Sequence, residues 1–479
     1  MLTNQRPRSS IVSLLIGLSG VGIGIVAGFI AGAKPLYLYL LLVAIPVVVF
    51  FFARFEQAVI GLLILRSTLD PWSSQQLPAA FAIGLDALTL LYVTVKLLTG
   101  QRVYTDGFWW FFAGWVAVQG LWVILLPLGG LGLDASLLPE SIREWIRLFS
   151  WLMVYLLVMQ LKERLPPEKV ISGLFLALVI PVTVALLQIF VPAILPHFLA
   201  AGGDDGSRIK GTIGHSNGFV TFLLLFIGLT YWKLKQSRQH LPWLLLLSLL
   251  AFLYVNTKAL FGLIMVATFV LVLIAPRLNI PNFIGGAIFL VLVIGLFAST
   301  EFGRERLSLI ANTPLLNPDI DVWRAILLSQ GDTNSFNWRL AHWNLLLNAW
   351  QQFPILGYGL ASAQAIGKGY LAHNDYIRAL VEGGIVGFVT FLVFLGVQGI
   401  RIIQLMQSAP RGSAKRDLCL IMLALFLSIP VAMITENIWS HTTLFFYWMT
   451  LMAVAGWDWN ERSTVSVNPS GQISSSFPN

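Results

Sequence analysis

Long apolar runs follow one another along almost the whole of this chain, and they limit what it can fold into. A membrane-spanning helix needs about 20 largely apolar residues. Hydrophobic residues make up 57% of the sequence and charged residues only 11%, a composition far from that of soluble globular proteins. We therefore predict an all-α polytopic membrane protein. The candidate spans are residues 11–31, 36–53, 80–99, 108–128, 143–163, 169–191, 217–235, 241–256, 258–275, 282–299, 377–404, 416–435 and 441–457.

One shorter apolar run, 56–67, ends with Arg66. It is interpreted as a thin or tilted span or as a re-entrant segment. Counting this run, we expect a bundle of about 12–14 transmembrane helices, formed as a single unit by residues 1–457. The first run, 11–31, is interpreted as a retained span and not as a cleaved signal peptide, because further spans follow it. Residues 458–479 are rich in Ser, Asn and Pro, which predicts a disordered cytoplasmic tail.

The charges of the loops predict an orientation. With the N-terminus in the cytoplasm, the loops on the inner side are short and rich in Lys and Arg, as the positive-inside rule requires. The two long connections, 192–216 and 300–376, then lie on the outer side. The second is expected to be partly helical, with one helix at 321–328 and another at 338–351 that begins near 335–337. Many basic residues remain on this outer side, against the trend of the rule, and they predict an anionic partner there.

A dense polar cluster stands at the start of the run 377–404. Polar residues at a membrane edge are expensive to keep, so they are candidates for a functional role. If a helix begins near His373, then Arg378 and Glu382 share one face at i,i+4 spacing and can pair, while His373 points elsewhere and does not pair directly with Glu382. The alternative is a capped helix start with a purely structural Arg378–Glu382 pair. The cluster comprises His373, Asn374, Asp375, Tyr376, Arg378 and Glu382.

Three basic motifs fall on the same predicted outer side. Residues 208–217 read Arg-Ile-Lys-Gly-Thr-Ile-Gly-His-Ser-Asn. Such basic residues and glycines can bind phosphate oxygens, or they can touch lipid headgroups as a flexible loop. Lys258 stands between two spans, where it can either reach the interface or meet an anion inside the bundle. Arg339 lies on a predicted amphipathic helix, where an arginine is usually solvated.

Other charged and reactive residues carry weaker signals. Arg143 and Arg147, at i,i+4 spacing near the start of a span, are interpreted as interface anchors. Glu436 and Asp86 are isolated acids, which give little support for a proton relay. The single cysteine, Cys419, is expected to pack within the bundle. The sequence holds no metal-binding motif, so we expect neither a catalytic metal nor a cofactor, and the net charge of +8 needs no nucleic acid to explain it.

Two of these motifs together resemble a known family. The pattern Arg-x-x-Gly-x-x-Gly-x-x-Asn precedes a span at 208–217, and a large outer loop ends in His-Asn, seven residues, then Glu-x-Gly-x-x-Gly at 373–387. This arrangement resembles the O-antigen ligase/polymerase superfamily. The likeness covers roughly residues 140–440, and its most specific part is 372–387.

The resemblance implies a set of roles for these residues. Members of this superfamily handle polyprenyl-pyrophosphate-linked glycans on the outer face of the inner membrane. It implies that Arg208, Lys258 and Arg339 hold the pyrophosphate and that His373 is the general base. Many members have Ser-Arg where this chain has Thr257-Lys258, so the bidentate fork of arginine is lost there. The residues expected to support the site are Asn217, Asn374, Tyr376, Arg378 and Glu382.

The function expected from this resemblance is a metal-independent polymerase that joins lipid-linked oligosaccharide repeat units into an exported polysaccharide. Alternatives within the superfamily are an O-antigen ligase, which transfers the glycan to lipid A core, and a protein O-glycosyltransferase. From other classes, an anion (bicarbonate) carrier and a non-catalytic assembly partner stay open, although no internal repeat of the transporter kind is found. The expected location is the bacterial inner membrane, with a periplasmic active face and both termini in the cytoplasm. The expected partners are the lipid-linked donor, a glycan acceptor, the bilayer, a flippase and a chain-length regulator.

Overall fold

The computed structural model describes residues 35–459, apart from 129–134, 203–206, 278, 312, 315–316, 318 and 330–334. Within these ranges the regular elements are helices, and the β pairing is a single isolated bridge between Gly202 and Arg208. The predicted all-α polytopic class is confirmed. The first predicted span, 11–31, and most of the predicted tail, 458–479, lie outside the described residues.

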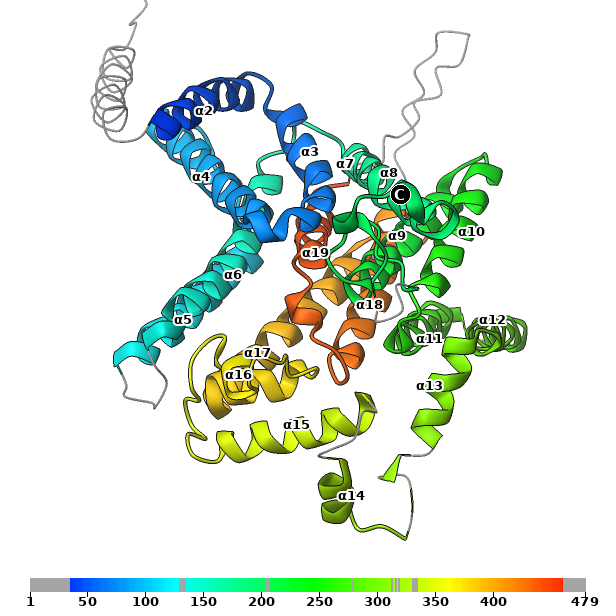
Figure 1. Cartoon of the computed structure of the whole chain (residues 1–479). Coiled ribbons are helices and arrows are strands. Elements are labelled where there is room, and N and C mark those ends of the chain that lie inside the picture. Colours follow the sequence, from blue (N-terminus) through cyan, green and yellow to red (C-terminus); the bar gives the residue numbers. More distant parts are fainter. Residues whose placement is uncertain are drawn as a thin grey trace, which may run out of the picture.

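Figure 1 shows the arrangement of the helices. The helices before the large outer loop are α2 (Pro35–Ala53), α3 (Phe55–Leu65), α4 (Leu77–Leu98), α5 (Gly107–Leu128), α6 (Leu138–Met159), α7 (Pro167–Leu174), α8 (Val179–Phe190), α9 (Ser216–Gln236), α10 (Leu241–Asn256), α11 (Leu260–Ile274) and α12 (Ile280–Ser299). The outer loop carries α13 (Glu301–Ala311), α14 (Val322–Leu328), α15 (Ser335–Trp350) and α16 (Ser362–Ile366). The chain then returns through α17 (Asp375–Ser408), α18 (Ala414–Ala432) and α19 (Thr442–Ala455).

Among the described residues, five helical stretches are long and apolar enough to cross a membrane, or six with one bent pair. They are α4, α5, the nearly continuous stretch α7–α8, α9 and α17. Helices α10, α11 and α19 and the stretch Phe283–Ser299 of α12 are apolar but shorter. Helices α6 and α18, which the sequence predicts as spans, both carry charged residues in their first turns. The length and composition of the described helices therefore establish fewer spans than the predicted 12–14. That total stays a prediction.

The short run 56–67 forms the second arm of a bend in the structure. The helical stretches Ala44–Ala53 and Phe55–Thr68 meet at 119°, as in a broken span or a re-entrant segment. Arg66 near its end is buried and forms an ion pair with Asp70 at 2.6 Å. A buried charge of this kind needs its partner, so the ion pair holds the end of the bend.

The core is built around α19, in which the residues from Thr443 to Ala455 are buried. A helix that is apolar on all sides belongs in the interior of a bundle. Just before it, the indole of Trp439 is enclosed by aromatic rings from α19 and three other helices, in the edge-to-face geometry that such pairs prefer. These rings, with that of Phe445 in α19, are Trp115, Trp151, Phe391 and Phe394.

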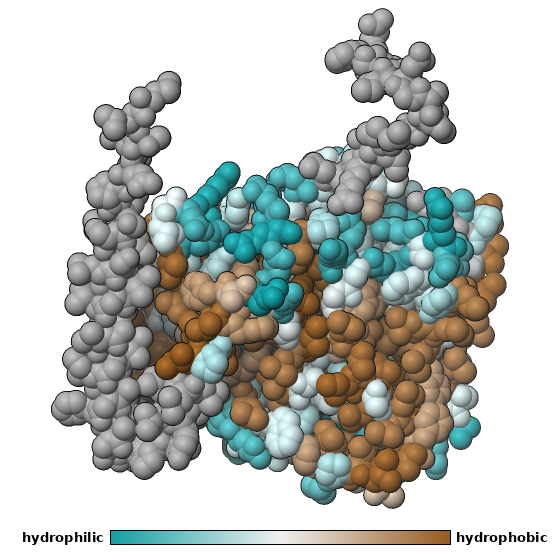
Figure 2. All heavy atoms as spheres, turned by 90° about the horizontal axis from the view of Figure 1, so that it is seen from above, coloured by the Kyte–Doolittle hydropathy of each residue, from teal (hydrophilic) through white to brown (hydrophobic). Residues whose placement is uncertain are grey.

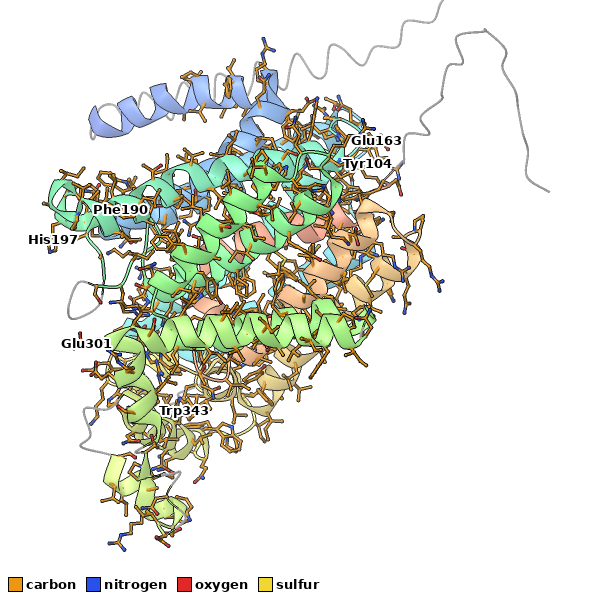
Figure 3. All side chains as sticks on the ribbon, turned by 90° about the vertical axis from the view of Figure 1, so that its right-hand side faces the viewer. Tyr104, Glu163, Phe190, His197, Glu301 and Trp343 are labelled. Carbon is orange, nitrogen blue, oxygen red and sulfur yellow. The ribbon has the colours of Figure 1, made fainter. Side chains whose placement is uncertain are left out.

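The two ends of the bundle are distinct. Hydrophobic side chains cover much of the face in Figure 2, and hydrophilic ones gather along one edge of it. In Figure 3, Tyr104 and Glu163 lie at one end of the helices, and Phe190, His197 and Glu301 lie at the opposite end. This grouping agrees with the predicted topology, in which the long loops share one face.

The outer loop folds onto α17 as a cap. The two helices predicted for this loop are confirmed as α14 and α15, and the start predicted at 335–337 is also confirmed. A small apolar core lies under the cap, and Trp343 of α15 donates a hydrogen bond to the carbonyl of Ala372 at 2.7 Å. The buried residues of that core are Leu346, Tyr358, Ala363, Ala372 and Val381.

Helix α17 is broken at Gly384, where φ is 60° and ψ is −162°. This conformation is essentially restricted to glycine. The connection that follows α15 packs into the break: the N–H of Ile385 donates to the carbonyl of Pro354 at 2.8 Å, and that of Gly359 donates to the carbonyl of Glu382 at 2.8 Å. These bonds satisfy backbone groups that the broken helix leaves open, as the interior of a membrane requires.

Candidate functional site

The site is built on the first turn of α17. Asn374 is the N-cap of this helix, and its side chain accepts hydrogen bonds from the backbone N–H groups of Tyr376 and Ile377, both at 3.0 Å. The predicted capped helix start is therefore confirmed. The hydroxyl of Tyr376 donates to the carbonyl of Pro430 at 2.8 Å and so ties α17 to α18.

His373 precedes this cap in a left-handed conformation, with φ of 49°. Residues other than glycine rarely adopt this conformation, so the surrounding contacts must hold His373 in it. The N–H of His373 donates to Oδ1 of Asn437 at 2.9 Å, and its Nδ1 lies 3.2 Å from Oε1 of Glu436. Two residues on, Asp375 accepts a bond from the N–H of Trp439 at 2.8 Å. The start of α17 is thus fastened to the loop between α18 and α19.

Glu436 is the buried centre of these contacts. Its second carboxylate oxygen, Oε2, accepts a short hydrogen bond from the amide of Asn217 in α9. Burial alone would raise the pKa of Glu436, but the hydrogen bond and charge of His373 outweigh it, with a further contribution from Arg339, and the pKa falls to about 2. Glu436 is therefore an ionised acceptor over the whole physiological pH range.

The contacts continue from Asn217 to the first basic motif. Nη2 of Arg208 donates to Oδ1 of Asn217 at 2.6 Å, and its Nε donates to the carbonyl of Thr257 at 3.2 Å. Lys258, next in the chain, donates from Nζ to the hydroxyl of Ser207 at 2.6 Å and has a φ of 52°. The structure thus brings the loop before α9 and the corner between α10 and α11 to the same place as His373.

Arg339 approaches from the cap. It lies in the first turns of α15 and is half-buried. Its charge contributes to the low pKa of Glu436, and the ring of its neighbour Trp338 lies 6.1 Å from that of His373. The predicted pyrophosphate residues Arg208, Lys258 and Arg339 therefore come from three separate segments. Arg208 is linked to the imidazole–carboxylate pair through Asn217, whereas Lys258 lies beside Ser207, the residue before Arg208.

A cavity of about 460 Å³ opens beside this pair. His373, Glu436 and Asn217 line one part of it, together with two further imidazoles, those of His215 and His441. Burial lowers the pKa of His441 to about 4, and burial followed by the charge of Arg208 lowers the pKa of His215. These two rings are therefore neutral near pH 7. Sequence reasoning did not select either of them.

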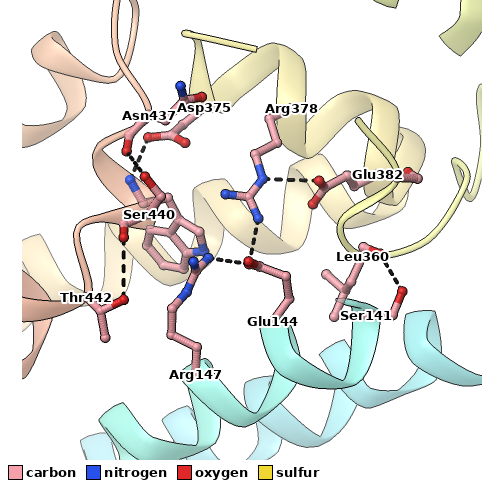
Figure 4. A network of polar contacts seen from close by, with 12 residues as sticks. Ser141, Glu144, Arg147, Leu360, Asp375, Arg378, Glu382, Asn437, Ser440 and Thr442 are labelled. Atoms are coloured by element: carbon pink, nitrogen blue, oxygen red, sulfur yellow. Dashed lines mark hydrogen bonds and ion pairs between the residues drawn. The ribbon is translucent and has the colours of Figure 1, made fainter. Parts of the chain in front are cut away.

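Arg378 and Glu382 form a second cluster, shown in Figure 4. Nε of Arg378 lies 3.1 Å from Oε1 of Glu382, which confirms the predicted i,i+4 pair, and its Nη2 lies 2.8 Å from Oε2 of Glu144 in α6. Glu144 also pairs with Arg147. The interpretation of Arg147 as an interface anchor is wrong, because its side chain is only 15% exposed. Its neighbour Arg143 is 60% exposed, as an anchor would be.

The structure therefore sorts the predicted residues into two groups. Asn217 and His373 meet at Glu436, and Arg208 joins them through Asn217. Arg378 instead pairs with Glu382 of its own helix and with Glu144 of α6. Asp86, the other isolated acid of the sequence, accepts a hydrogen bond from Ser150 of α6 at 2.7 Å within the bundle. Among the described residues, no group of three or more His, Cys, Asp or Glu side chains has the arrangement of a metal site. Metal independence remains a prediction.

Sequence reasoning treated Glu436 only as an isolated acid. No local spacing connects it with His373, which stands 63 positions earlier. The available signal was topological: both residues fall at the same predicted membrane face, beside the starts or ends of spans. That signal alone does not identify a partner.

The fold and the site together define a polytopic membrane protein with a histidine–carboxylate pair and a basic cluster at one face. A family model described as O-antigen ligase matches residues 243–392. Over this stretch, which is less than half of the chain, the match confirms the resemblance to the O-antigen ligase/polymerase superfamily seen in the sequence. The matched stretch runs from α10 into α17 and includes His373, but it ends before Glu436. No curated protein matches the chain.

Proposed function

We propose that the protein is a bacterial inner-membrane polymerase that joins polyprenyl-pyrophosphate-linked oligosaccharide repeat units, with its active site at the periplasmic face. The observation that carries the proposal is the contact of His373 with the buried Glu436, which Asn217 links to Arg208. The pair supplies a base, and the arginine supplies positive charge for a phosphate. Both are needed for a glycosyl transfer from a lipid pyrophosphate.

The base follows from the ionisation of Glu436. An ionised carboxylate is only an acceptor, so Nδ1 of His373 carries the proton and Nε2 carries the lone pair. In this tautomer Nε2 accepts the proton of an acceptor-sugar hydroxyl as the new glycosidic bond forms. Glu436 then stabilises the imidazolium, as the buried carboxylate of a catalytic triad does.

The leaving group determines the role of the basic residues. The hydroxyl oxygen attacks the anomeric carbon of the donor, and the bond from that carbon to the phosphate oxygen breaks. The bonding electrons remain on the lipid pyrophosphate, and a single displacement inverts the anomeric configuration. Arg208, Lys258 and Arg339 stabilise the charge that develops on the leaving oxygen. Arg208 is oriented for this role by Asn217 and by the carbonyl of Thr257.

The second cluster has a supporting role in this proposal. Arg378 and Glu382 hold α17 against α6, and Asn374 and Tyr376 fix its first turn. None of these four side chains touches Glu436 among the contacts described above. They position the segment that carries His373.

The alternatives differ in the acceptor or in the class of protein. An O-antigen ligase uses the same donor chemistry but delivers the glycan to lipid A core. An anion carrier would use a basic vestibule, but the family match to residues 243–392 favours a transferase. A chain-length regulator and a flippase are the partners that a polymerase of this kind implies.

The experiment compares the surface glycan of a deletion strain carrying either the wild-type gene or His373→Ala. A polymerase predicts loss of long chains with a single repeat unit retained, and rescue by the wild type alone. Loss of all surface-attached glycan with accumulation of full-length lipid-linked polymer would identify a ligase instead. An unchanged glycan in the deletion strain would refute the transferase function in that pathway.

A further inference from the structure

Three aromatic rings form a group directly beside His373. The rings of Trp338 and His342, one helical turn apart in α15, are stacked at 4.8 Å. Tyr370 meets Trp338 edge to face at 5.2 Å. Trp338 in turn meets the imidazole of His373 at 6.1 Å and 75°. We name Trp338, His342 and Tyr370 the aromatic platform.

The aromatic platform is buried at one end and exposed at the other. His342 is buried, whereas Tyr370 is 60% exposed. The next residue, Leu371, lines the same cavity as His373. An aromatic residue that serves only to fill a core is normally enclosed, as Trp439 is. Tyr370 instead leaves most of its surface exposed, one position before a residue that lines the cavity.

An exposed aromatic face beside a base has a chemical meaning in a glycosyltransferase. The C–H groups of a pyranose ring carry partial positive charge, and the face of an aromatic ring is negative. Binding sites commonly combine such aromatic surfaces with a few polar groups that fix orientation. A sugar ring on the platform would have its hydroxyls within reach of an imidazole only one ring away.

The role of His373 assigns the sugar that stacks beside it. Trp338 touches His373, and His373 touches Glu436. In the proposed transfer the base removes its proton from a hydroxyl of the acceptor and not from the donor. The sugar ring next to His373 on the aromatic platform is therefore the acceptor ring.

We infer that Tyr370 and Trp338 form the subsite for the acceptor sugar, a pyranose stacked on the aromatic platform with a hydroxyl directed at His373. This inference rests on the proposed glycosyl transfer. The competing explanation is that Tyr370 anchors the protein in the lipid interface, as exposed Tyr and Trp residues often do. The two explanations predict different effects on sugar binding.

Binding is measured by saturation-transfer NMR on the purified full-length protein in detergent. The probe is the soluble oligosaccharide freed by mild acid from the lipid-linked glycan of the host cell. Tyr370→Ala removes the exposed face, and we expect its affinity for the probe to fall about tenfold. Tyr370→Phe keeps the face and should bind as the wild type does. Phe198→Ala is the matched control, because Phe198 is a 43% exposed aromatic residue of another loop, the long connection 192–216.

The measurement is repeated with His373→Ala, which keeps the platform but removes the base, so binding is read without catalysis. In transfer assays, Tyr370→Ala should raise KM for the acceptor and leave kcat and the donor KM near their wild-type values. Equal binding by wild type and Tyr370→Ala, or no binding by wild type, would overturn the subsite. Wild type that binds the sugar but transfers none would refute the proposed function and leave a sugar-binding site in place.

Discussion

Nδ1 of His373 lies 3.2 Å from Oε1 of Glu436, although 63 positions separate the two residues in the chain. The contact joins the start of α17 to the loop before α19. Because Asn217 of α9 occupies the other carboxylate oxygen, three segments depend on one buried charge. The ionisation of Glu436 should therefore affect both the base and the stability of the fold.

The first prediction concerns the stability of the fold at acid pH. The pKa of Glu436 is lowered from its ordinary value of 4.5 to about 2, so between these values the unfolded chain binds more protons than the folded chain. Stability contributed by Glu436 is then fully present above pH 4.5 and is lost as the pH falls through about 2. Thermal unfolding in detergent, measured from pH 7 to pH 3, should show a steeper acid loss for wild type than for Glu436→Gln.

Glu140→Gln is the control for this titration. Glu140 is also a carboxylate of the outer side, but its side chain is 47% exposed and its partner Arg143 is 4.0 Å away. Its acid dependence should match that of the wild type. If Glu436→Gln also follows the wild-type curve, the low pKa of Glu436 is contradicted.

The second prediction concerns the buried cluster between α6 and α17. Arg378→Met leaves the buried Glu382 without its charged partner, which typically costs about 3–5 kcal/mol, and it removes one of the two partners of Glu144. Arg143→Met in the same helix α6 removes a 60% exposed charge and should change the free energy of unfolding by less than about 0.5 kcal/mol. Thermal unfolding of both variants tests the difference. Equal unfolding temperatures would mean that the cluster contributes no stability.

The third prediction concerns the break in α17. A Cβ on Gly384 would lie 2.3 Å from the carbonyl oxygen of Ile355, and the backbone φ of 60° is itself unfavourable for alanine. Gly384→Ala should therefore lower the free energy of unfolding by at least about 2 kcal/mol. Gly396 lies in the same helix with nothing within 4 Å of its Cβ position, so Gly396→Ala should be neutral or slightly stabilising. Similar losses for both variants would contradict the close packing at Gly384.

Local spacing predicted the start of α17 correctly. The N-cap of Asn374 and the Arg378–Glu382 pair both depend on residues within one or two helical turns, where helical geometry fixes which side chains can meet. The run 56–67 also stood out as an unusually short apolar run, and a re-entrant segment was one of its interpretations. In each of these cases, all the residues on which the prediction depends lie in one segment of the sequence.

Contacts between distant segments were not predictable in the same way. Arg147 was interpreted as an interface anchor from its place near the start of a span. Its partner Glu144 also pairs with Arg378 of α17, and only the packing of α6 on α17 reveals that Arg147 is largely buried. The same holds for Glu436, whose role in the site depends on its contacts with His373 and Asn217 from distant segments. The positions of such residues depend on how helices cross, and one sequence does not give the crossings.

The fourth prediction concerns the orientation of the site. Lys368 follows α16 in the cap, and Arg411 lies in the turn between α17 and α18. Because α17 separates them, reporter fusions at Lys368 and Arg411 should give opposite results, outside for the first and inside for the second. A fusion at Ser237, between α9 and α10, should also report inside, since its neighbouring loop residues are basic. A reversed pattern would place His373 on the cytoplasmic side and would exclude the periplasmic site.

The fifth prediction concerns the pyrophosphate. Arg208→Ala and Arg339→Ala should each lower glycan transfer about 100-fold or more, because each removes a positive charge that stabilises the leaving group. The amounts of both proteins in the membrane should stay normal. Arg208→Lys retains the charge without the bidentate fork and should fall between wild type and Arg208→Ala. A wild-type level of glycan transfer by both alanine variants would exclude Arg208 and Arg339 as ligands of the pyrophosphate.

A structural role for Arg208 must be separated from a role in binding, since this side chain also orients Asn217. Inorganic pyrophosphate serves as the probe, because it competes with the donor for the proposed basic residues without carrying a sugar or a lipid. If the arginines contact the donor, pyrophosphate should inhibit wild type, and the residual activity of Arg339→Ala should need a higher concentration for half-inhibition. Equal inhibition of both would mean that Arg339 acts through Glu436 and not on the substrate, because its charge also lowers the pKa of that carboxylate.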